Sequence, residues 1–258
     1  MKNKGFLVAL GLVLALQGLS VSAKAWEEDF HYGLTKWLAA NAGFCPPHAE
    51  AVAVYAIAPD DDPQRNALEL TKRRIIPLGD VSASRIVSRW HFPSLIDVPA
   101  RPTERYVCSG CDQARSIFVT AANPNQQNPL LVFGEGLHLF QDSWSHEGVP
   151  GTIGLRDNIF WAHPELRGGP LRHDADLTHL YPYSALLSAS QVYLAMLTFL
   201  NRYQRYACIP PERWDDIKAD VENFIEADSK LKKRRWFDDT RVMYSRKDFL
   251  DRVNLPER

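Results

Sequence analysis

The fold is decided by residues 136–148, whose sequence is GLHLFQDSWSHEG. As a helix, this stretch places His138, Asp142 and His146 at i, i+4 and i+8, so that two imidazoles and one carboxylate share a face. Zinc binds nitrogen and carboxylate oxygen at roughly 2.0–2.2 Å. The stretch therefore predicts a metal-binding helix. The alternative is a half-buried helix with hydrogen-bonded histidines, and the other histidines of the chain decide between the two.

The first 25 residues have the pattern of a secretory signal peptide. Lys2 and Lys4 precede an apolar run from Phe6 to Leu16, and alanines flank Lys24. The run is too short to span a bilayer comfortably. We therefore expect a periplasmic or secreted protein that begins at Trp26 and has no stable membrane anchor.

The mature chain, residues 26–258, is expected to be one all-α domain of several helices. With 258 residues and 45% hydrophobic composition the chain can bury a full core. Apolar periodicity predicts helices over residues 130–147 and 182–206. No P-loop, dinucleotide-binding fingerprint or Gly-X-Ser-X-Gly elbow is present.

Charge argues against broad attraction to nucleic acid or to anionic membranes. Removing residues 1–25 takes away three lysines and no acid, which shifts the formal net charge from −1 to −4. A mildly acidic protein lacks the overall positive electrostatic potential that attracts nucleic acids and anionic membranes.

Four cysteines fit an oxidising compartment and allow two disulfides. We pair Cys108 with Cys111 and Cys45 with Cys208. The Cys-Ser-Gly-Cys sequence could also be half a zinc site or a redox motif, but no second cysteine pair and no thioredoxin-like strand pattern accompany it.

Two segments near the mature N-terminus offer further ligands. Trp26, with a free α-amino group after cleavage, and His31 would form one chelating set at the start of a helix that runs to Ala42. Residues 49–58 predict a buried helix that ends at Pro59 and leads into the acids 60–62. Because a helix C-terminus disfavours acids, we expect a positive group near them, and an Asp-rich turn is the alternative.

The second half of the chain contains one more ligand-rich segment and one basic run. Residues 149–172 are predicted to form a long loop that leads to His173-Asp-Ala-Asp-Leu-Thr-His179. A charged helix is predicted from residue 211 or 212 to Leu231. The basic run 230–235 is then its solvated end, where the helix dipole favours cations.

The order of these features resembles the superfamily of zinc-dependent bacterial phospholipases C and tri-zinc single-strand nucleases. The stretch 136–148 is most similar to an uncharacterised bacterial branch of it. The resemblance covers scattered positions from Trp26 to His179, including the Trp-His-Phe sequence around His91. It implies the all-helical fold of that superfamily and up to three zinc ions.

Carried over to this chain, the resemblance implies ligands that are imidazoles, carboxylates and the mature N-terminus: Trp26, His31, Asp61, His91, His138, Asp142, His146, His173 and Asp176. Asp142 would bridge the first two ions, and either Asp60 or Asp61 would bind the second ion and orient the attacking water. In the third site, His146 and the His173–Asp176 pair depart from the family spacing, so His179 or Asp174 is an alternative ligand there.

These implications predict a phosphodiester hydrolase, since two cations can activate a water and clamp a phosphodiester. We expect a phospholipase C-like enzyme, with a single-strand nuclease as the alternative and no protein partner. A di-metal hydrolase built on His173-Asp174 would leave Trp26 unexplained. A metal-binding protein that has kept the fold and lost catalysis is the third possibility.

Overall fold

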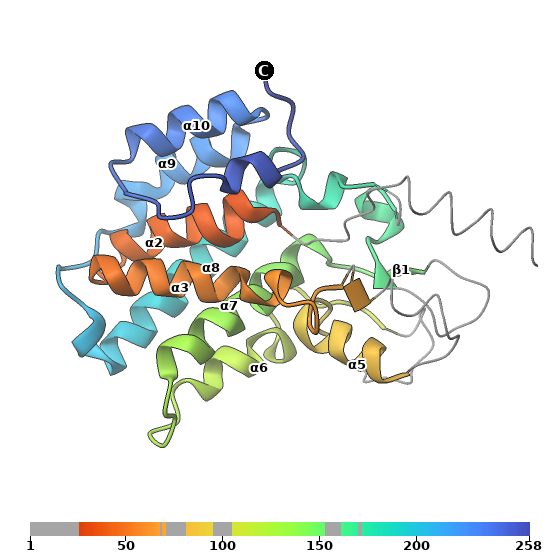
Figure 1. Ribbon diagram of the computed structural model, residues 1–258, viewed down its shortest axis with the longest axis horizontal. Helices are drawn as coiled ribbons and strands as arrows, with labels where there is room; N and C mark the ends of the chain where they lie inside the picture. The colour runs from red at the N-terminus through yellow and green to blue at the C-terminus, as the bar shows by residue number, and fades with distance from the viewer. Residues whose placement is uncertain (1–25, 68, 71–80, 95–104, 153–160, 170–171) are drawn as a thin grey trace, which may run out of the picture.

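The computed structural model describes residues 26–67, 69–70, 81–94, 105–152, 161–169 and 172–258, and the expected signal peptide lies outside these residues. The described part is built from helices, which confirms the predicted all-α class (Figure 1). One small antiparallel pair joins strand β1 (Gly151–Thr152) to strand β2 (Trp161–Ala162). The pair lies within the segment 149–172, which was predicted to be loop throughout.

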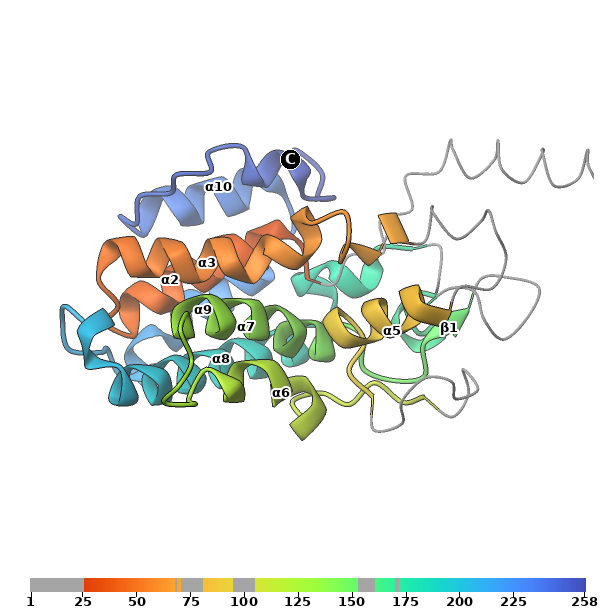
Figure 2. The same cartoon turned by 60° about the horizontal axis from the view of Figure 1, so that its bottom comes forward.

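Helix α7 (Pro129–Ser145) is the centre of the bundle and confirms the helix predicted around His138. It packs against α3 (Pro46–Asp61), α6 (Asp112–Thr120) and α8 (Pro182–Arg202) (Figures 1 and 2). Two glycines allow this close packing. A Cβ atom at Gly136 would lie 2.3 Å from the backbone nitrogen of Phe118, and one at Gly134 would lie 2.5 Å from Cβ of Tyr55.

The N-terminal helix starts with a π-helical turn, η1 (Asp29–Leu34), and continues as α2 (Thr35–Asn41), in agreement with the predicted helix. Helix α3 departs from the prediction because it continues through Pro59 to Asp61. The last turn of the helix therefore separates neighbouring acids onto different faces.

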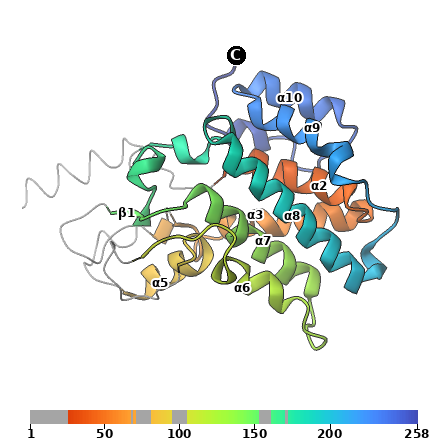
Figure 3. The same ribbon diagram turned by 180° about the vertical axis from the view of Figure 1, so that it is seen from behind.

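Helix α8 is, among the described residues, the one helix long and apolar enough to cross a membrane. It packs instead against α2, α7 and α9 (Trp214–Glu226), as Figure 3 shows from behind. The buried part of its apolar surface thus belongs to the core of the bundle.

The remaining elements are short. Helix α5 (Val81–Trp90) precedes His91, and α10 (Lys230–Asp239) packs beside α9. Short 3-10 turns lie between or after the longer helices: η3 (Glu165–Arg167), η4 (Asp174–Asp176), η5 (Thr178–Leu180), η6 (Gln204–Tyr206) and η7 (Phe249–Arg252).

The basic run 230–235 is not the solvated end of a helix, as was predicted, but the beginning of α10. Helix α9 ends at Glu226, and the side chain of Ser229 accepts a hydrogen bond from Lys232 N at 3.4 Å, which caps the new helix. One lysine of the run, Lys233, is fully buried. Its ammonium lies 2.9 Å from Asp29 and donates to the carbonyl of Phe224 at 2.8 Å.

Both predicted disulfides are confirmed. Cys45–Cys208 joins the start of α3 to the segment that follows η6, and Cys108–Cys111 closes a short loop before α6. No cysteine of the chain is left free, so neither a zinc half-site nor a dithiol is present.

The buried pair between Lys233 and Asp29 gives the first testable prediction. Replacing Lys233 by Met leaves the Asp29 carboxylate buried without its cation, and we expect a loss of about 3–5 kcal/mol in the free energy of unfolding. Denaturant unfolding measures this loss. Lys232→Met is the matched control, because Lys232 forms an exposed pair with Asp228 and should change stability by less than about 1 kcal/mol. Equal effects of the two substitutions would contradict the role given to Lys233.

Candidate metal centre

The carboxylate of Asp142 is fully buried among three imidazoles from different parts of the chain. Asp142 Oδ1 lies 3.0 Å from His31 Nε2 on η1. Asp142 Oδ2 lies 2.9 Å from Nδ1 of His91, which follows α5, and 3.3 Å from Nε2 of His138, one turn earlier on α7. With Asp60, these residues form what we call the Asp142 cluster. The face of α7 predicted from the i, i+4 spacing is thus confirmed for His138 and Asp142.

Each of these imidazoles is held by its outer ring nitrogen. The outer nitrogens of His31, His91 and His138 each face a carbonyl oxygen, on Gln141 Oε1 (2.7 Å), Arg65 O (2.9 Å) and Ala56 O (2.7 Å) respectively. A carbonyl can only accept, so the outer nitrogen must carry the proton and donate. The inner nitrogen of each neutral ring is therefore left with a lone pair that points into the cluster. Histidines that bind metals are oriented in this way.

This arrangement requires positive charge inside the cluster. Lone pairs of neutral imidazoles cannot donate to the carboxylate of Asp142, so either protons or a metal cation must lie between them. Burial alone would raise the pKa of Asp142, yet His138 and His31 hold it well below its usual value. For His91, burial alone would lower the pKa, but the contact with Asp142 raises it, and the net shift is upward.

The distances within the cluster fit a metal ion. Ligand atoms around a tetrahedral zinc at about 2.1 Å lie roughly 3.4 Å apart. The nitrogen–oxygen separations in the Asp142 cluster run from 2.9 Å to 3.9 Å. Asp60 Oδ2 is buried and has no hydrogen-bond partner within the described part of the chain, and the contact partner of His31 Nε2 is Asp142 Oδ1 at 3.0 Å.

Asp60, and not Asp61, belongs to the cluster. Asp60 Oδ1 lies 3.7 Å from His138 Nε2 and 3.9 Å from His91 Nδ1, and the residue is buried. Asp61 is exposed and pairs with Arg246 at 2.8 Å. Consecutive residues of a helix point about 100° apart, and because α3 extends to Asp61, only one of the two acids can face the core. The prediction of Asp61 as a ligand was wrong.

The positive groups expected near these acids are present for two of them. Asp61 pairs with Arg246, and Asp62 accepts from Arg65 Nε at 2.7 Å, whereas Asp60 faces imidazoles. The hydrogen bond from the Gln64 backbone, with that from Arg65, lowers the pKa of Asp62.

A second set, which we call the Asp176 cluster, combines His146, His163 and Asp176 and is also buried. His163 Nε2 lies 2.7 Å from Asp176 Oδ1, and the outer nitrogens of His146 and His163 donate to the carbonyls of His91 (3.1 Å) and Arg172 (2.6 Å). Burial and the neighbouring His163 lower the pKa of His146 to about 3, so this ring stays neutral and available as a ligand. His146 Nε2 has no hydrogen-bond partner among the described residues.

The edge of this cluster is formed by His173 and Glu27. His173 Nδ1 lies 3.3 Å from the other oxygen of Asp176, and Glu27, His173 and Asp176 each offer one ligand atom, all within 4.8 Å of one another. Burial, with the nearby Asp176 and Asp29, raises the pKa of Glu27 to about 8. Burial also raises the pKa of Asp176. Two such carboxylates side by side favour a cation between them.

Three other predicted ligands are not placed in either cluster. The side chain of Trp26 is buried and stacks on Phe30 at 5.4 Å, and chelation by its α-amino group stays a prediction because residue 25 lies outside the described residues. Asp174 pairs with Arg172 at 3.2 Å, which takes it away from a paired His173–Asp174 site. His179 has a pKa lowered by burial and by Lys233, and it is not in either cluster.

Glu27 and His163 were missed by the analysis of the sequence. His163 directly follows β2, inside the segment treated as loop, and Glu27 was hidden beside Trp26. The sequence offered one signal for His163, which is the presence of the histidine itself. It could have been considered as a candidate ligand together with the other histidines.

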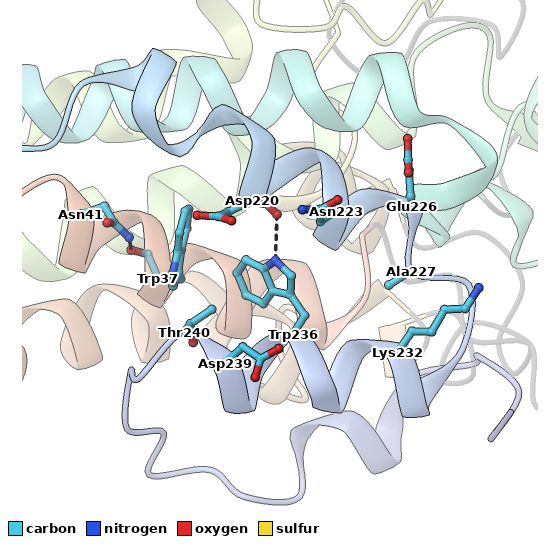
Figure 4. A pocket seen from close by; sticks show the side chains of 10 residues that line it. All are labelled: Trp37, Asn41, Asp220, Asn223, Glu226, Ala227, Lys232, Trp236, Asp239 and Thr240. Atoms are coloured by element: carbon cyan, nitrogen blue, oxygen red, sulfur yellow. Dashed lines mark hydrogen bonds between the residues drawn. The ribbon is translucent and has the colours of Figure 1, made fainter.

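A separate cleft lies between α9 and α10, with a volume of about 650 Å³. Figure 4 shows Trp236 at its middle, where the indole nitrogen donates to the carbonyl of Asp220 at 2.7 Å. The described residues that line it include Trp37 but none of the residues of the two candidate metal clusters, so this cleft is separate from them.

Comparisons with known proteins give a family and no function. Residues 27–160 match the family of unknown function DUF6765, and this span includes all five residues of the Asp142 cluster, together with Glu27 and His146. No curated protein and no solved structure matches the chain significantly. Since the match covers just over half of the chain, the protein belongs to DUF6765, a family of unknown function.

Proposed function

We propose that this protein is an exported, zinc-dependent phosphodiester hydrolase of the phospholipase C and single-strand nuclease type. One observation carries the proposal. Five buried imidazoles have their outer nitrogen on a carbonyl oxygen and their inner nitrogen turned toward a buried carboxylate: His31, His91, His138, His146 and His163. Outer-nitrogen hydrogen bonds of this kind fix metal-binding histidines.

The ligand set favours zinc. Imidazole nitrogen with a few carboxylate oxygens suits zinc better than calcium or magnesium, which prefer oxygen alone. In the Asp142 cluster, Asp60, His91, His138 and Asp142 would hold one ion. Because His31 faces the other oxygen of Asp142, that carboxylate is placed to bridge to a second ion, whose set the N-terminus of Trp26 would complete.

The Asp176 cluster would hold a further ion through His146, His163 and Asp176, with His173 or Glu27 at its edge. The side chain of His173 is 24% exposed, so solvent reaches the cluster from that side. His163 replaces His173 in the ligand set expected from the resemblance.

Bound divalent cations would supply activation of a water and neutralisation of the phosphate oxygens. Within the chain, Asp60 is the residue placed to receive a proton. Its Oδ1 faces His138, whereas its Oδ2 has no hydrogen-bond partner in the described part of the chain. The water oxygen would bond to phosphorus as its proton passes to Asp60, and the ester bond on the opposite side would break. The leaving alkoxide would take a proton from solvent water, and Asp60 would return its proton to solvent.

Export is supported by the disulfides. Cys45–Cys208 and Cys108–Cys111 use all four cysteines, as is common in the periplasm and outside cells and rare in the cytosol. We therefore propose a periplasmic or secreted location.

One observation favours the nuclease alternative. A cleft of about 450 Å³ near His91 is lined, as far as the structure describes it, by Arg85 and Arg89 together with neutral side chains and by no acid. Guanidinium groups bind phosphate oxygens in two-pronged hydrogen bonds, so this cleft suits a substrate with several phosphates.

Asp60 and Asp61 form a matched pair of test positions. In zinc-loaded protein, Asp60→Asn should lower kcat for bis(p-nitrophenyl) phosphate at least about 100-fold, because it removes the proton acceptor and weakens a ligand. Asp61→Asn should stay within about twofold of the wild type, since Asp61 contacts only surface arginines. Phospholipid vesicles and single-stranded DNA, assayed in parallel, choose between the two substrate classes.

Two results would contradict the proposal. Equal activities of the two variants would remove Asp60 from the chemistry. A zinc-loaded wild type that hydrolyses none of the three substrates would leave the non-catalytic metal-binding alternative.

A pH dependence follows from the charges of the centre. In metal-free protein the pKa of His91 is raised, so the stability it contributes is present at low pH and is lost as the pH rises through that pKa. Glu27, with a pKa near 8, acts in the same direction because the fold holds its proton more tightly than the unfolded chain does. Zinc takes the place of these protons. We expect the difference in Tm between zinc-loaded and chelator-treated protein to grow from pH 6.5 to pH 8, and a constant or shrinking difference would refute this linkage.

A further inference from the structure

An apolar groove is lined by residues of α6, α7 and α8; Figures 2 and 3 show these three helices side by side. Its volume is about 520 Å³, within the range of small-molecule sites. Phe133 and Phe140 of α7 line it. Phe140 is two positions from both His138 and Asp142, so it points about 200° away from them around the helix. The groove is therefore on the face of α7 opposite to the Asp142 cluster.

The groove leaves apolar surface open to solvent. Val119 and Leu194, which line it from α6 and α8, are 57% and 55% exposed. Only 44% of the most apolar stretch of α8 is buried in the bundle. Packing of the core thus does not account for all the apolar residues of α8, and a contiguous open patch of this kind marks a binding surface.

Charge identifies the class of ligand. Among the described residues, two arginines, Arg115 and Arg202, line the groove, and no acid does. Arg115 lies near the Phe140 end, with its guanidinium carbon 5.8 Å from that ring, and its buried Nε has no hydrogen-bond partner in the described part of the chain. An unpaired donor at the end of an apolar groove calls for an anionic acceptor.

The two arginines mark opposite ends. Phe133 stacks on Phe199 at 4.2 Å, and Phe199 contacts Tyr203 at 4.9 Å, so Arg202 belongs to the Phe133 end. Along α8 the lining residues run from Gln191 to Arg202 and beyond, roughly 16 Å at 1.5 Å per residue. The Tyr203 hydroxyl donates to the carbonyl of Ala121 at 2.7 Å and closes this end.

We propose that this groove binds one long-chain carboxylate, with the acyl chain between α6 and α8, the methyl end toward Tyr203 and the carboxylate on Arg115. The site is separate from the metal centre and does not depend on the hydrolase activity. A single acyl chain fits a groove that extends roughly 16 Å along α8, and the guanidinium of Arg115, whose Nε has no hydrogen-bond partner in the described part of the chain, is the cation that lines its Phe140 end.

The test is calorimetric titration of the full-length mature, zinc-loaded protein with dodecanoate below its critical micelle concentration. We expect saturable binding of one molecule per chain. Arg115→Gln should weaken binding about tenfold or more, the size expected when one charge-assisted hydrogen bond is lost. The matched control is Arg202→Gln, at the far end of the groove, which should stay within about twofold.

Further variants keep the outcome interpretable. Leu194→Trp, which fills the groove from its exposed rim, should abolish binding with an unchanged Tm. Asp60→Asn should bind dodecanoate like the wild type, which separates this site from the proposed hydrolase. The proposal is overturned by absence of saturable binding, by binding only to micelles or vesicles, by equal affinity for dodecyltrimethylammonium, or by equal losses in the Arg115 and Arg202 variants.

Discussion

The rest of the structure depends on one buried charge, the carboxylate of Asp142. Three imidazoles face it, and carbonyl oxygens on their far sides hold the outer protons in place, so the inner nitrogens carry lone pairs. A buried carboxylate surrounded by lone pairs is costly unless a cation lies between them. The packing of α3 against both α7 and η1 brings these groups together. The candidate metal centre is therefore the polar core of the bundle, and binding of a cation there would be coupled to folding stability.

The C-terminal part of the chain fixes the first described residues through side-chain contacts. Three consecutive acids, residues 27–29, are buried, and each meets a partner from beyond residue 230. Glu27 accepts from the side chain of Asn254 at 2.6 Å, Glu28 pairs with Arg246 at 2.8 Å, and Asp29 pairs with Lys233 at 2.9 Å. These contacts fix the segment that leads into His31. They also bring Glu27 beside the Asp176 cluster, so the C-terminal helices position the candidate ligands of the N-terminal segment.

The sequence was most informative where local spacing determines geometry. The helix of residues 130–147 and the shared face of His138 and Asp142 follow from the 3.6-residue period, and the disulfides were paired correctly. Tertiary packing decided the rest. The choice between Asp60 and Asp61 depended on α3 continuing through Pro59, and His163 entered the site by way of a short strand without a periodic pattern. Likewise, nothing local in the basic run showed that Lys233 is buried, because its partner Asp29 lies some two hundred residues away.

The metal content of the exported, purified protein, measured by elemental analysis on the wild type and two histidine variants, tests the central claim most directly. We expect at least two equivalents of tightly bound zinc per chain, a loss of at least one in His138→Ala, and full retention in His48→Ala, whose ring lies outside both clusters against Tyr206. A wild type without tightly bound metal would contradict the claim. Equal metal content in all three proteins would contradict it as well, and the Asp142 cluster would then hold its charge with protons alone.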